Sequence, residues 1–541
     1  MLPFENQGAL EDEYFADGMT DEITARLSSI SRLEVIARTS AYQYKKTSKT
    51  PQKIGDELSV SYILYGTVRW QKQPGGASKV RVTPSLVRIS DATQIWANPY
   101  EAMIAEVFQV QSDIALQVAE ALNVALLEPE RRSIEAKPTE NMEAYQYYLR
   151  GNEYFQRSYS DQDLRIAVQM YEKAVKLDPN FAQAYAYLAI THSRIYWFYY
   201  DRTEGRLAKA KGAADRALEL RPDLAEAHTA LGYYYYMGYL DYEHALEQFA
   251  VAQKSKPNDS NLIFGIAIVQ RRQGRFKEAA VNFTKAFELD PRSSHNAFNL
   301  AETYFLMRLY PEMERNLNKA ISLSPDWLVP QTYKALLYLG WKGDPEKARE
   351  AMKMFPKDAS EKGYVFPVWI LINLIEGKYQ EALDLLSAEP LEAFETQVYF
   401  IPKAELYAQI YGFMKKAQLE QTHYDSARKF LEIKVHELPE DVRIRGALAI
   451  AYAGLGLKQK AIQESEKAVG LLPISKEAYS GTYRILDLAK VYTMVGEYDK
   501  AIAQLEFLLS IPSSLSVPLL RLDPVWTPLR SHPRFQKLLK R

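Results

Sequence analysis

The sequence predicts a mainly α fold, in which an N-terminal α/β domain precedes an α-solenoid of about ten helix pairs. Three observations support this prediction. Prolines recur every 34 residues through much of the chain, small and large apolar residues keep fixed offsets from them, and the first 130 residues lack this period. Because a repeated supersecondary unit leaves a fixed period in the sequence, the repeats set the fold class for most of the chain.

The proline spacing defines the repeat. Pro257, Pro291 and Pro325 are 34 residues apart, and so are Pro439 and Pro473. Alanine recurs five residues before Pro179, Pro222, Pro257, Pro291, Pro325 and Pro473, at positions 174, 217, 252, 286, 320 and 468. It also recurs twelve residues before Pro179, Pro222, Pro257, Pro291, Pro439 and Pro473, at positions 167, 210, 245, 279, 427 and 461. Small residues let two antiparallel helices approach closely, and proline ends a helix because it has no amide hydrogen to donate. The pattern therefore predicts helix–turn–helix units.

This period and pattern resemble the tetratricopeptide repeat (TPR) family. In its first helix that family places an aromatic residue, a leucine, a small residue and a tyrosine. The corresponding residues here are His228, Leu231, Gly232 and Tyr235, then Ala297, Leu300, Ala301 and Tyr304, then Arg445, Leu448, Ala449 and Tyr452. Ten units are predicted to begin near Ala144, Ala182, Ala225, Ser260, Ser294, Leu328, Tyr364, Pro402, Val442 and Thr482.

The predicted TPR superhelix covers residues 142–515 and is irregular over 355–402, where prolines and an apolar stretch disturb the register. The last segment, 516–541, has a different pattern. Because the final repeat of a solenoid leaves an apolar face uncovered, we predict that this segment is a cap, with Trp526, Leu529 and Phe535 as the covering residues.

Residues 1–130 switch between strand and helix patterns, which is typical of an α/β domain. The expected elements are a strand fragment at 2–4, a helix at 20–30 with Thr20 as its N-cap, a strand at 33–37 and a helix at 51–58 after Thr50. Three strands follow at 62–71, 79–89 and 94–98, with turns at 74–76 and 91–92, and then a helix at 104–127. Residues 131–141 are predicted to link this domain to the repeats.

Several segments of this domain resemble the TolB amino-terminal-like (FlgO-like) domain, which precedes TPR arrays in bacterial multidomain regulators. The matching segments are 2–6, 14–23, 35–40 and 66–69, together with Trp96. In that family the first strand begins several residues before the Leu-Pro-Phe segment, so we expect this strand to be truncated. The resemblance also implies an effector upstream, such as a protein kinase, a nucleotide cyclase or a winged-helix DNA-binding domain.

Composition excludes several classes of function. The 67 basic and 68 acidic residues leave no surplus of positive charge for nucleic-acid binding, and the absence of cysteine excludes disulfides and thiolate chemistry. The longest apolar runs, 262–269 and 368–375, are about half as long as a membrane-spanning helix. We expect a cytoplasmic protein, or a periplasmic one if a membrane anchor lies upstream.

No catalytic residue, metal or cofactor is predicted. The chain lacks the phosphate-loop, zinc-protease, nucleophile-elbow and kinase motifs. His228 and His244 form a conceivable metal pair, although packing between helices is the favoured interpretation. Residues 38–40 with Asp17 and Gly18 could line a ligand crevice, and the favoured alternative is that Asp17 and Gly18 form the turn before the first helix.

A binding role remains, in the concave groove that the first helices of a TPR array line. The predicted groove residues are Tyr233, Tyr236, Phe264, Arg271, Arg272, His295, Phe298 and Phe305. Exposed aromatic rings beside arginine are typical of peptide-binding surfaces. The four residues 233–236 point in four helical directions, however, so at least two of these tyrosine rings belong to the core.

The chaperone-binding members of the family use a Lys/Asn clamp on this groove. The corresponding lysine positions hold Ala186, Thr229, Phe264 and Phe298, and the asparagine positions hold Ile190, Tyr233, Ile268 and Glu302. A clamp for a chaperone tail is therefore not predicted. The sequence favours a non-enzymatic protein–protein interaction scaffold in bacterial signalling or regulation. The alternative is the regulatory or sensor portion of a larger kinase, cyclase or transcriptional regulator.

Overall fold

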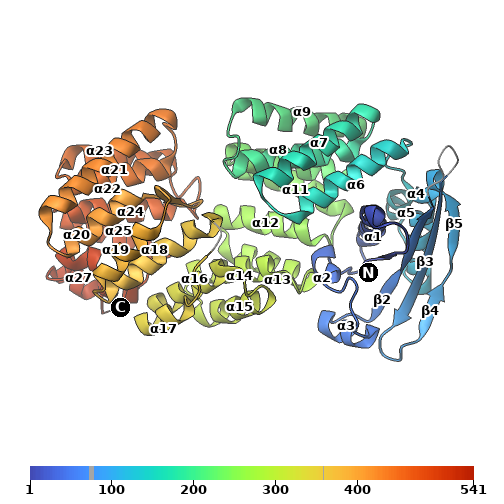
Figure 1. The fold of residues 1–541 in the computed structure, drawn as a ribbon, viewed down its shortest axis with the longest axis horizontal. Coiled ribbons are helices and arrows are strands. Elements are labelled where there is room, and N and C mark those ends of the chain that lie inside the picture. Colours follow the sequence, from blue (N-terminus) through green and yellow to red (C-terminus); the bar gives the residue numbers. More distant parts are fainter. Residues whose placement is uncertain (72–77, 357–358, 541) are drawn as a thin grey trace. The chain divides into compact units, whose positions relative to one another are not determined.

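The computed structural model describes residues 1–71, 78–356 and 359–540 (Figure 1). It confirms the predicted fold class, an N-terminal α/β domain followed by ten helix pairs. The chain divides into two compact units. Unit 1 comprises Met1–Val269 and Val281–Ser293, and unit 2 comprises Gln270–Ala280 and Ser294–Arg541. The predicted boundaries at residues 130, 141 and 515 remain predictions.

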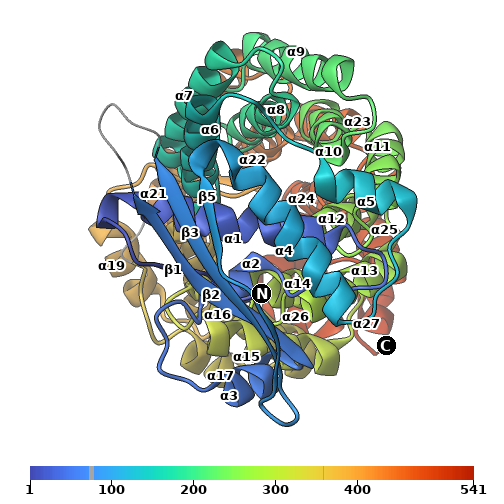
Figure 2. The ribbon, with the colours of Figure 1, turned by 90° about the vertical axis from the view of Figure 1, so that its right-hand side faces the viewer.

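The sheet of unit 1 contains strands β1 (Glu5–Asn6), β2 (Tyr62–Gln71), β3 (Lys79–Arg88), β4 (Gln94–Ala97) and β5 (Tyr100–Met103). β1 runs parallel to β2, β2 and β3 form an antiparallel hairpin, and β4 and β5 both pair with β3. Figure 2 looks onto these strands. Strands β2, β3 and β4 were predicted, whereas β5 was not, and β1 lies just after the predicted fragment at 2–4. The predicted turn at 74–76 lies outside the described residues.

Five helices accompany the sheet: α1 (Glu13–Ser28), α2 (Arg38–Tyr42), α3 (Pro51–Leu58), α4 (Val107–Ala121) and α5 (Glu128–Glu135). α1 and α4 lie on the same side of the sheet and share its core (Figure 1). Thr50 caps α3 as predicted. The segment predicted as a linker begins within α5, where the buried Ile134 carbonyl accepts a hydrogen bond from Ser112 Oγ at 2.8 Å.

Two expectations for this domain are wrong. Thr20 is not an N-cap but lies in the middle of α1, where its buried Oγ1 accepts a hydrogen bond from the Phe4 amide at 2.9 Å. Residues 33–37 form no strand: the Ala37 amide donates to the Leu289 carbonyl, and the Leu33 carbonyl accepts a hydrogen bond from the Asn258 side chain. Both errors arise where tertiary contacts override a local pattern.

The helix pairs of unit 1 begin close to their predicted positions. The first helices are α6 (Met142–Arg157), α8 (Ala182–Trp197), α10 (Ala225–Tyr234) and α12 (Ser260–Arg272), and the second helices are α7 (Asp161–Leu177), α9 (Glu204–Leu220), α11 (Tyr242–Ser255) and α13 (Phe276–Leu289). The boundary between the units passes through α12 and α13. A π-helical turn, η3 (Tyr235–Tyr239), extends α10.

The remaining pairs belong to unit 2. Their first helices are α14 (Ser294–Leu306), α16 (Leu328–Leu337), α18 (Ala359–Ile375), α20 (Lys403–Phe413), α22 (Val442–Gly454) and α24 (Gly481–Met494). Their second helices are α15 (Tyr310–Leu323), α17 (Pro345–Ala351), α19 (Tyr379–Ala388), α21 (Ala417–Glu437), α23 (Lys458–Leu471) and α25 (Tyr498–Ser510). A π-helical turn, η4 (Tyr338–Lys342), extends α16. In the two units together, six first helices begin at the predicted residue, and α18 differs most, beginning five residues early.

The irregular span contains a hairpin of β6 (Ala393–Glu395) and β7 (Phe400–Pro402) between α19 and α20. The cap consists of α26 (Val517–Leu522), the 3₁₀ helix η5 (Pro524–Leu529) and α27 (Pro533–Leu538). Trp526, Leu529 and Phe535 are buried against α24 and α25, as predicted. Among the described residues no helix is both long and apolar enough to cross a bilayer.

Candidate protein-interaction surface

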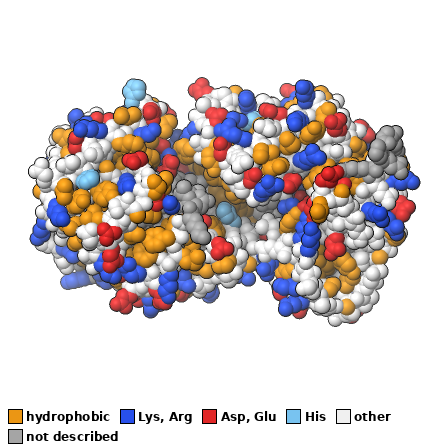
Figure 3. All heavy atoms as spheres, viewed as in Figure 1, with side chains coloured by type: hydrophobic (Ala, Val, Ile, Leu, Met, Phe, Trp, Pro, Cys, Tyr) orange, Lys and Arg blue, Asp and Glu red, His pale blue; other side chains and the backbone are white. Residues whose placement is uncertain are grey.

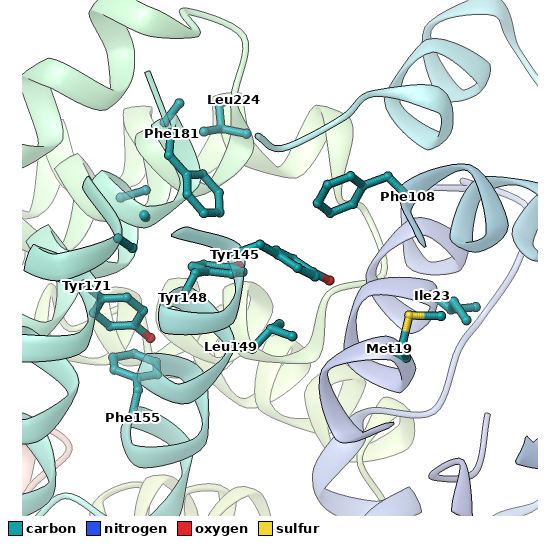
Figure 4. Packing of buried hydrophobic residues seen from close by; sticks show 14 of the residues in the cluster. Met19, Ile23, Phe108, Tyr145, Tyr148, Leu149, Phe155, Tyr171, Phe181 and Leu224 are labelled. Atoms are coloured by element: carbon teal, nitrogen blue, oxygen red, sulfur yellow. The ribbon is translucent and has the colours of Figure 1, made fainter. Parts of the chain in front are cut away.

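The candidate surface is the inner face of the repeats, which we define as the side of the first helices that carries the predicted groove residues. In the first pair this face is covered by the N-terminal domain (Figure 4). Tyr145 and Tyr148 of α6 are buried, and the Tyr145 ring lies 4.7 Å from the Phe108 ring of α4. Gly18 of α1 permits the contact, since a Cβ there would lie 2.6 Å from a Leu149 methyl group. The α/β domain and the first repeats therefore share one core.

A second contact joins the α/β domain to the end of unit 1. The Ala37 amide donates to the Leu289 carbonyl at 2.8 Å, and the Asn258 side chain donates to the Ser31 carbonyl at 3.2 Å. Ser40 Oγ donates to the Asp290 carboxylate and accepts a hydrogen bond from the Arg292 amide at 2.8 Å. The domain is thus held at both ends of the inner face of unit 1.

The repeats of unit 1 also contain a half-buried ion pair. Lys256 and Glu226 form an ion pair at 2.7 Å. Burial opposes ionisation of Glu226, yet the Lys256 ammonium keeps the pKa of Glu226 below its ordinary value. Burial raises the pKa of Glu22 on α1, although the positive charges of Arg26 and Lys256 lower it.

Of the predicted groove residues in unit 1, Tyr233 and Phe264 are half-buried and Tyr236 is buried, at 3% exposure. The Tyr233 hydroxyl lies against α12, 2.8 Å from the position that a Cβ of Gly265 would take. The adjacent Phe264 packs against Phe283, with 5.4 Å between ring centroids. Tyr233 and Phe264 are thus brought to neighbouring helices, whereas Tyr236 joins the core beside Trp197 and Tyr242. Of the run 233–236, Tyr234 and Tyr236 are buried, which confirms that at least two rings are core.

In unit 2 the predicted exposure of Arg271 and Arg272 is wrong: these side chains are 4% and 5% exposed. Arg271 forms an ion pair with Glu302 at 2.9 Å. The same carboxylate accepts hydrogen bonds from the hydroxyls of Tyr333 at 2.6 Å and Tyr479 at 2.7 Å. Burial raises the pKa of both tyrosines, so they stay protonated donors.

Arg272 contacts two segments that cross the inner face of unit 2. Its guanidinium donates to Gln397 at 2.8 Å and forms an ion pair with Glu477 at 3.4 Å. Gln397 lies at the tip of the β6–β7 hairpin, which also receives hydrogen bonds from Arg443 at Thr396 O and from Arg484 at Val398 O. The hairpin and the residues 477–480 therefore fill the inner face of unit 2.

The other predicted groove residues of unit 2 are His295, Phe298 and Phe305, and each packs against an aromatic ring. His295 is exposed and stacks on Trp327 at 5.0 Å, whereas Phe298 and Phe305 are buried and both contact the Tyr333 ring. The exposure expected of the two phenylalanines is therefore also wrong. The role of the eight residues in binding a partner remains a prediction.

The interpretation of Asp17 and Gly18 as the turn before the first helix is wrong, because the two residues lie inside α1. A ligand crevice that they line with residues 38–40 remains a prediction. Asp17 instead accepts hydrogen bonds from Tyr42 and from Lys45, the latter at 2.6 Å. Burial raises the pKa of the neighbouring Asp21 to about 7, although Arg38 at 2.6 Å opposes this. These contacts fasten α2 to α1 and leave the side chains occupied with one another.

The two histidines considered as a metal pair have separate partners. His228 is hydrogen-bonded to Gln248 and to the Pro222 carbonyl, and His244 to Asp241. Within the described ranges no group of three or more His, Cys, Asp or Glu side chains could hold a metal ion.

Comparisons with known proteins give partial matches, and no family profile matches the chain. It is 29% identical over 233 residues to putative adenylate cyclase 3 of Rhizobium meliloti (strain 1021), covering 43% of this chain and 39% of that protein. It is 23% identical over 231 residues to tetratricopeptide repeat protein 37 of Xenopus laevis, covering 36% of this chain and 14% of that protein. The chain thus spans less than half the length of either relative.

Among solved structures, PilF of Pseudomonas aeruginosa is 17% identical with a TM-score of 0.32, covering 46% of this chain and 97% of that chain. The helix pairs themselves form a TPR-like solenoid.

Sequence reasoning missed the residues that fill the inner faces. Tyr479, Gln397 and Glu477 lie in an insertion or a turn, where the 34-residue period gives no signal. Arg194 of α8 was also missed. When the second unit is aligned with the third, Ile190 takes the position of the groove residue Tyr233. Arg194 follows Ile190 by four residues, or about one helical turn, so the sequence could have placed it on the same inner face.

Proposed function

We propose that this chain is a non-enzymatic protein–protein interaction scaffold that binds a peptide or protein partner on the inner face of unit 1. One observation supports the proposal above others: Tyr233, Phe264 and Ile268 of neighbouring first helices remain half-exposed, in a structure that buries or pairs most of its inner residues. Large rings with partial exposure supply binding area at low entropic cost.

A protein partner is favoured over nucleic acid by charge. The formal net charge is −1, and on the face shown in Figure 3 basic and acidic side chains are interspersed. We place the protein in the bacterial cytoplasm, in signalling or regulation, on the TolB-like resemblance of its first domain.

Site-specific photo-crosslinking tests this proposal. A photoreactive phenylalanine analogue at Phe264 should yield a discrete protein adduct in cells of the source organism. The same residue at Val281, which is 69% exposed on α13, should not. Equal adducts at both positions, or none at Phe264, would contradict binding on the inner face.

A second candidate is the regulatory arm of a larger signalling protein. The observation that favours it is the match to a putative adenylate cyclase, which covers only 39% of that protein. Reading the genomic frame upstream of Met1 tests it directly. An open frame encoding a cyclase, kinase or winged-helix domain would support this candidate, and an adjacent in-frame stop codon would contradict it.

A further inference from the structure

Arg194 differs from the other buried or half-buried arginines on the first helices of the pairs. The others each have a carboxylate partner: Arg271 with Glu302, Arg272 with Glu477, Arg443 with Asp441, Arg445 with Glu464 and Arg484 with Asp487, at 2.5–3.4 Å. Arg194 is half-buried, and among the described residues it forms no ion pair. The structure thus leaves one inner-face guanidinium uncompensated.

The surroundings of Arg194 are aromatic. Its guanidinium carbon lies 3.9 Å from the Phe155 ring centroid and 5.1 Å from that of Tyr159. A ring face attracts the positive charge but does not replace the bidentate hydrogen bonds of a carboxylate, so the guanidinium donors can still serve another group. Tyr159 is 46% exposed, so this arrangement opens to solvent on one side.

Arg194 also lies next to the half-exposed surface of the third and fourth pairs. Arg194 lies on α8, which packs against α10, the helix that carries Tyr233. Burial raises the pKa of Tyr233 to about 12, and the positive charge of Arg194 opposes this rise. The Tyr233 hydroxyl in turn reaches α12 at Gly265, between Phe264 and Ile268. A basic group and an apolar surface therefore lie side by side on unit 1.

A half-buried charge without a partner costs free energy, and a carboxylate recovers it through charge-assisted, bidentate hydrogen bonds. Deepening the scaffold function proposed above, on which this inference rests, we infer that Arg194 binds the carboxylate of an aspartate or glutamate in an extended partner peptide. An apolar residue of the same peptide packs on Tyr233, Phe264 and Ile268. This site differs from the Lys/Asn clamp, whose positions here hold no lysine or asparagine.

The test selects peptides from a random dodecapeptide display library on the immobilised full chain. Enriched sequences should combine Asp or Glu with an apolar residue a few positions away. For a synthetic peptide of that consensus, Arg194→Gln should weaken binding at least tenfold and Arg194→Lys by less. Arg216→Gln, on the exposed face of the outer helix α9, is the matched control and should leave affinity unchanged. Circular dichroism verifies that each variant is folded.

Three outcomes would contradict the inference. If wild-type protein enriches no sequence, the Arg194 site is wrong, and photo-crosslinking at Phe264 decides whether the scaffold function stands. If it enriches peptides without acidic residues, or if Arg194→Gln binds the consensus peptide as wild type does, the scaffold function stands and the Arg194 site is wrong. Replacing the acidic residue of the peptide by its amide should weaken wild-type binding as Arg194→Gln does, and should have little further effect on the variant.

Discussion

The two compact units treat the same repeat geometry differently. Unit 1 covers its inner face with a separate α/β domain, held by α1 at one end and by residues 31–43 at the other, and it leaves Tyr233, Phe264 and Arg194 partly exposed. Unit 2 fills its inner face with its own hairpin and turn, where buried arginines meet carboxylates and carbonyls. We therefore expect the inner face of these helix pairs to bind a partner only where the chain itself does not occupy that face.

The largest effect is expected where unit 2 closes on itself. Arg308, in the turn between α14 and α15, donates to the carbonyls of Leu508, Ile511 and Leu515 and to Ser513 Oγ, at 2.8–2.9 Å. Arg308→Asn tolerates the positive φ of this residue, 56°, but loses all four hydrogen bonds. We expect a loss of about 4 kcal/mol in the unfolding free energy of unit 2.

Hydrogen exchange of residues 506–516 measures this loss, and exchange in the sheet of unit 1 should stay unchanged. Arg315→Asn is the control, because this side chain is exposed on α15 and its ion pair with Glu312 contributes little. Equal effects of the two variants would show that the closure does not stabilise unit 2.

The next largest effect is a pH dependence of stability that arises from a buried carboxyl group in unit 2 and not from its counterpart in unit 1. Glu226 in unit 1 is paired with Lys256, whereas burial raises the pKa of Glu405 on α20 to about 8, against the attraction of Lys490. Asp487, Tyr424 and Gln409 also face this carboxyl group. In the unfolded chain Glu405 loses its proton near its ordinary pKa of about 4.5, whereas in the folded chain it keeps the proton up to about pH 8. Folding must therefore take up a proton between these pH values, so the unfolding free energy falls as the pH rises from about 4.5 to about 8.

Glu405→Gln removes this titration and should make unit 2 about 3 kcal/mol more stable than wild type at pH 8, with little difference at pH 4.5. Thermal unfolding at the two pH values measures the change. Glu440→Gln, at an exposed position, is the control. A wild-type stability that is flat over this range would contradict the burial of an unpaired Glu405.

A smaller effect is expected from the packing that both units share. A Cβ on Gly232 would lie 2.4 Å from the Phe249 ring, at the crossing of α10 and α11. Gly232→Ala should therefore destabilise unit 1 by about 1–3 kcal/mol through overpacking. Gly212→Ala, on the exposed side of α9 with no atom within 4 Å, should stabilise it by up to about 1 kcal/mol. Denaturant unfolding gives both values, and the same sign for both variants would refute this account of the crossing.

The sequence predicted local, periodic features well and non-local ones poorly. Six helix starts were found because alanine, glycine and proline keep fixed offsets within one pair. The burial of Arg271 and Arg272 depends on Tyr479 and on the hairpin tip at Gln397, which are far away in sequence. Thr20 illustrates the same limit. Its neighbours resemble the start of a helix, but the helix begins at Glu13, and the Thr20 hydroxyl instead accepts a hydrogen bond from the distant Phe4 amide.

The most local effect concerns the contact that holds the α/β domain over unit 1. Ser40→Ala removes a donor to Asp290 and an acceptor for the Arg292 amide without leaving a large cavity. Two lost hydrogen bonds correspond to about 2 kcal/mol, or a roughly 30-fold faster local exchange if the contact opens independently of the rest. Deuterium uptake should rise in residues 36–44 and 289–293, and stay unchanged in the hairpin of unit 2.

Ser28→Ala is the control for this last variant, because the Ser28 hydroxyl bonds only within its own helix, to the Thr24 carbonyl. If uptake rises at Ser40→Ala and peptide binding at Tyr233 and Phe264 strengthens with it, the α/β domain competes with the partner for the inner face. If uptake rises and binding is unchanged, the domain only supports the surface beside it. Unchanged uptake would mean that the Ser40 hydrogen bonds do not hold the domain in solution, and the difference between the units would then rest on α1 and on the contacts of Ser31 and Ala37.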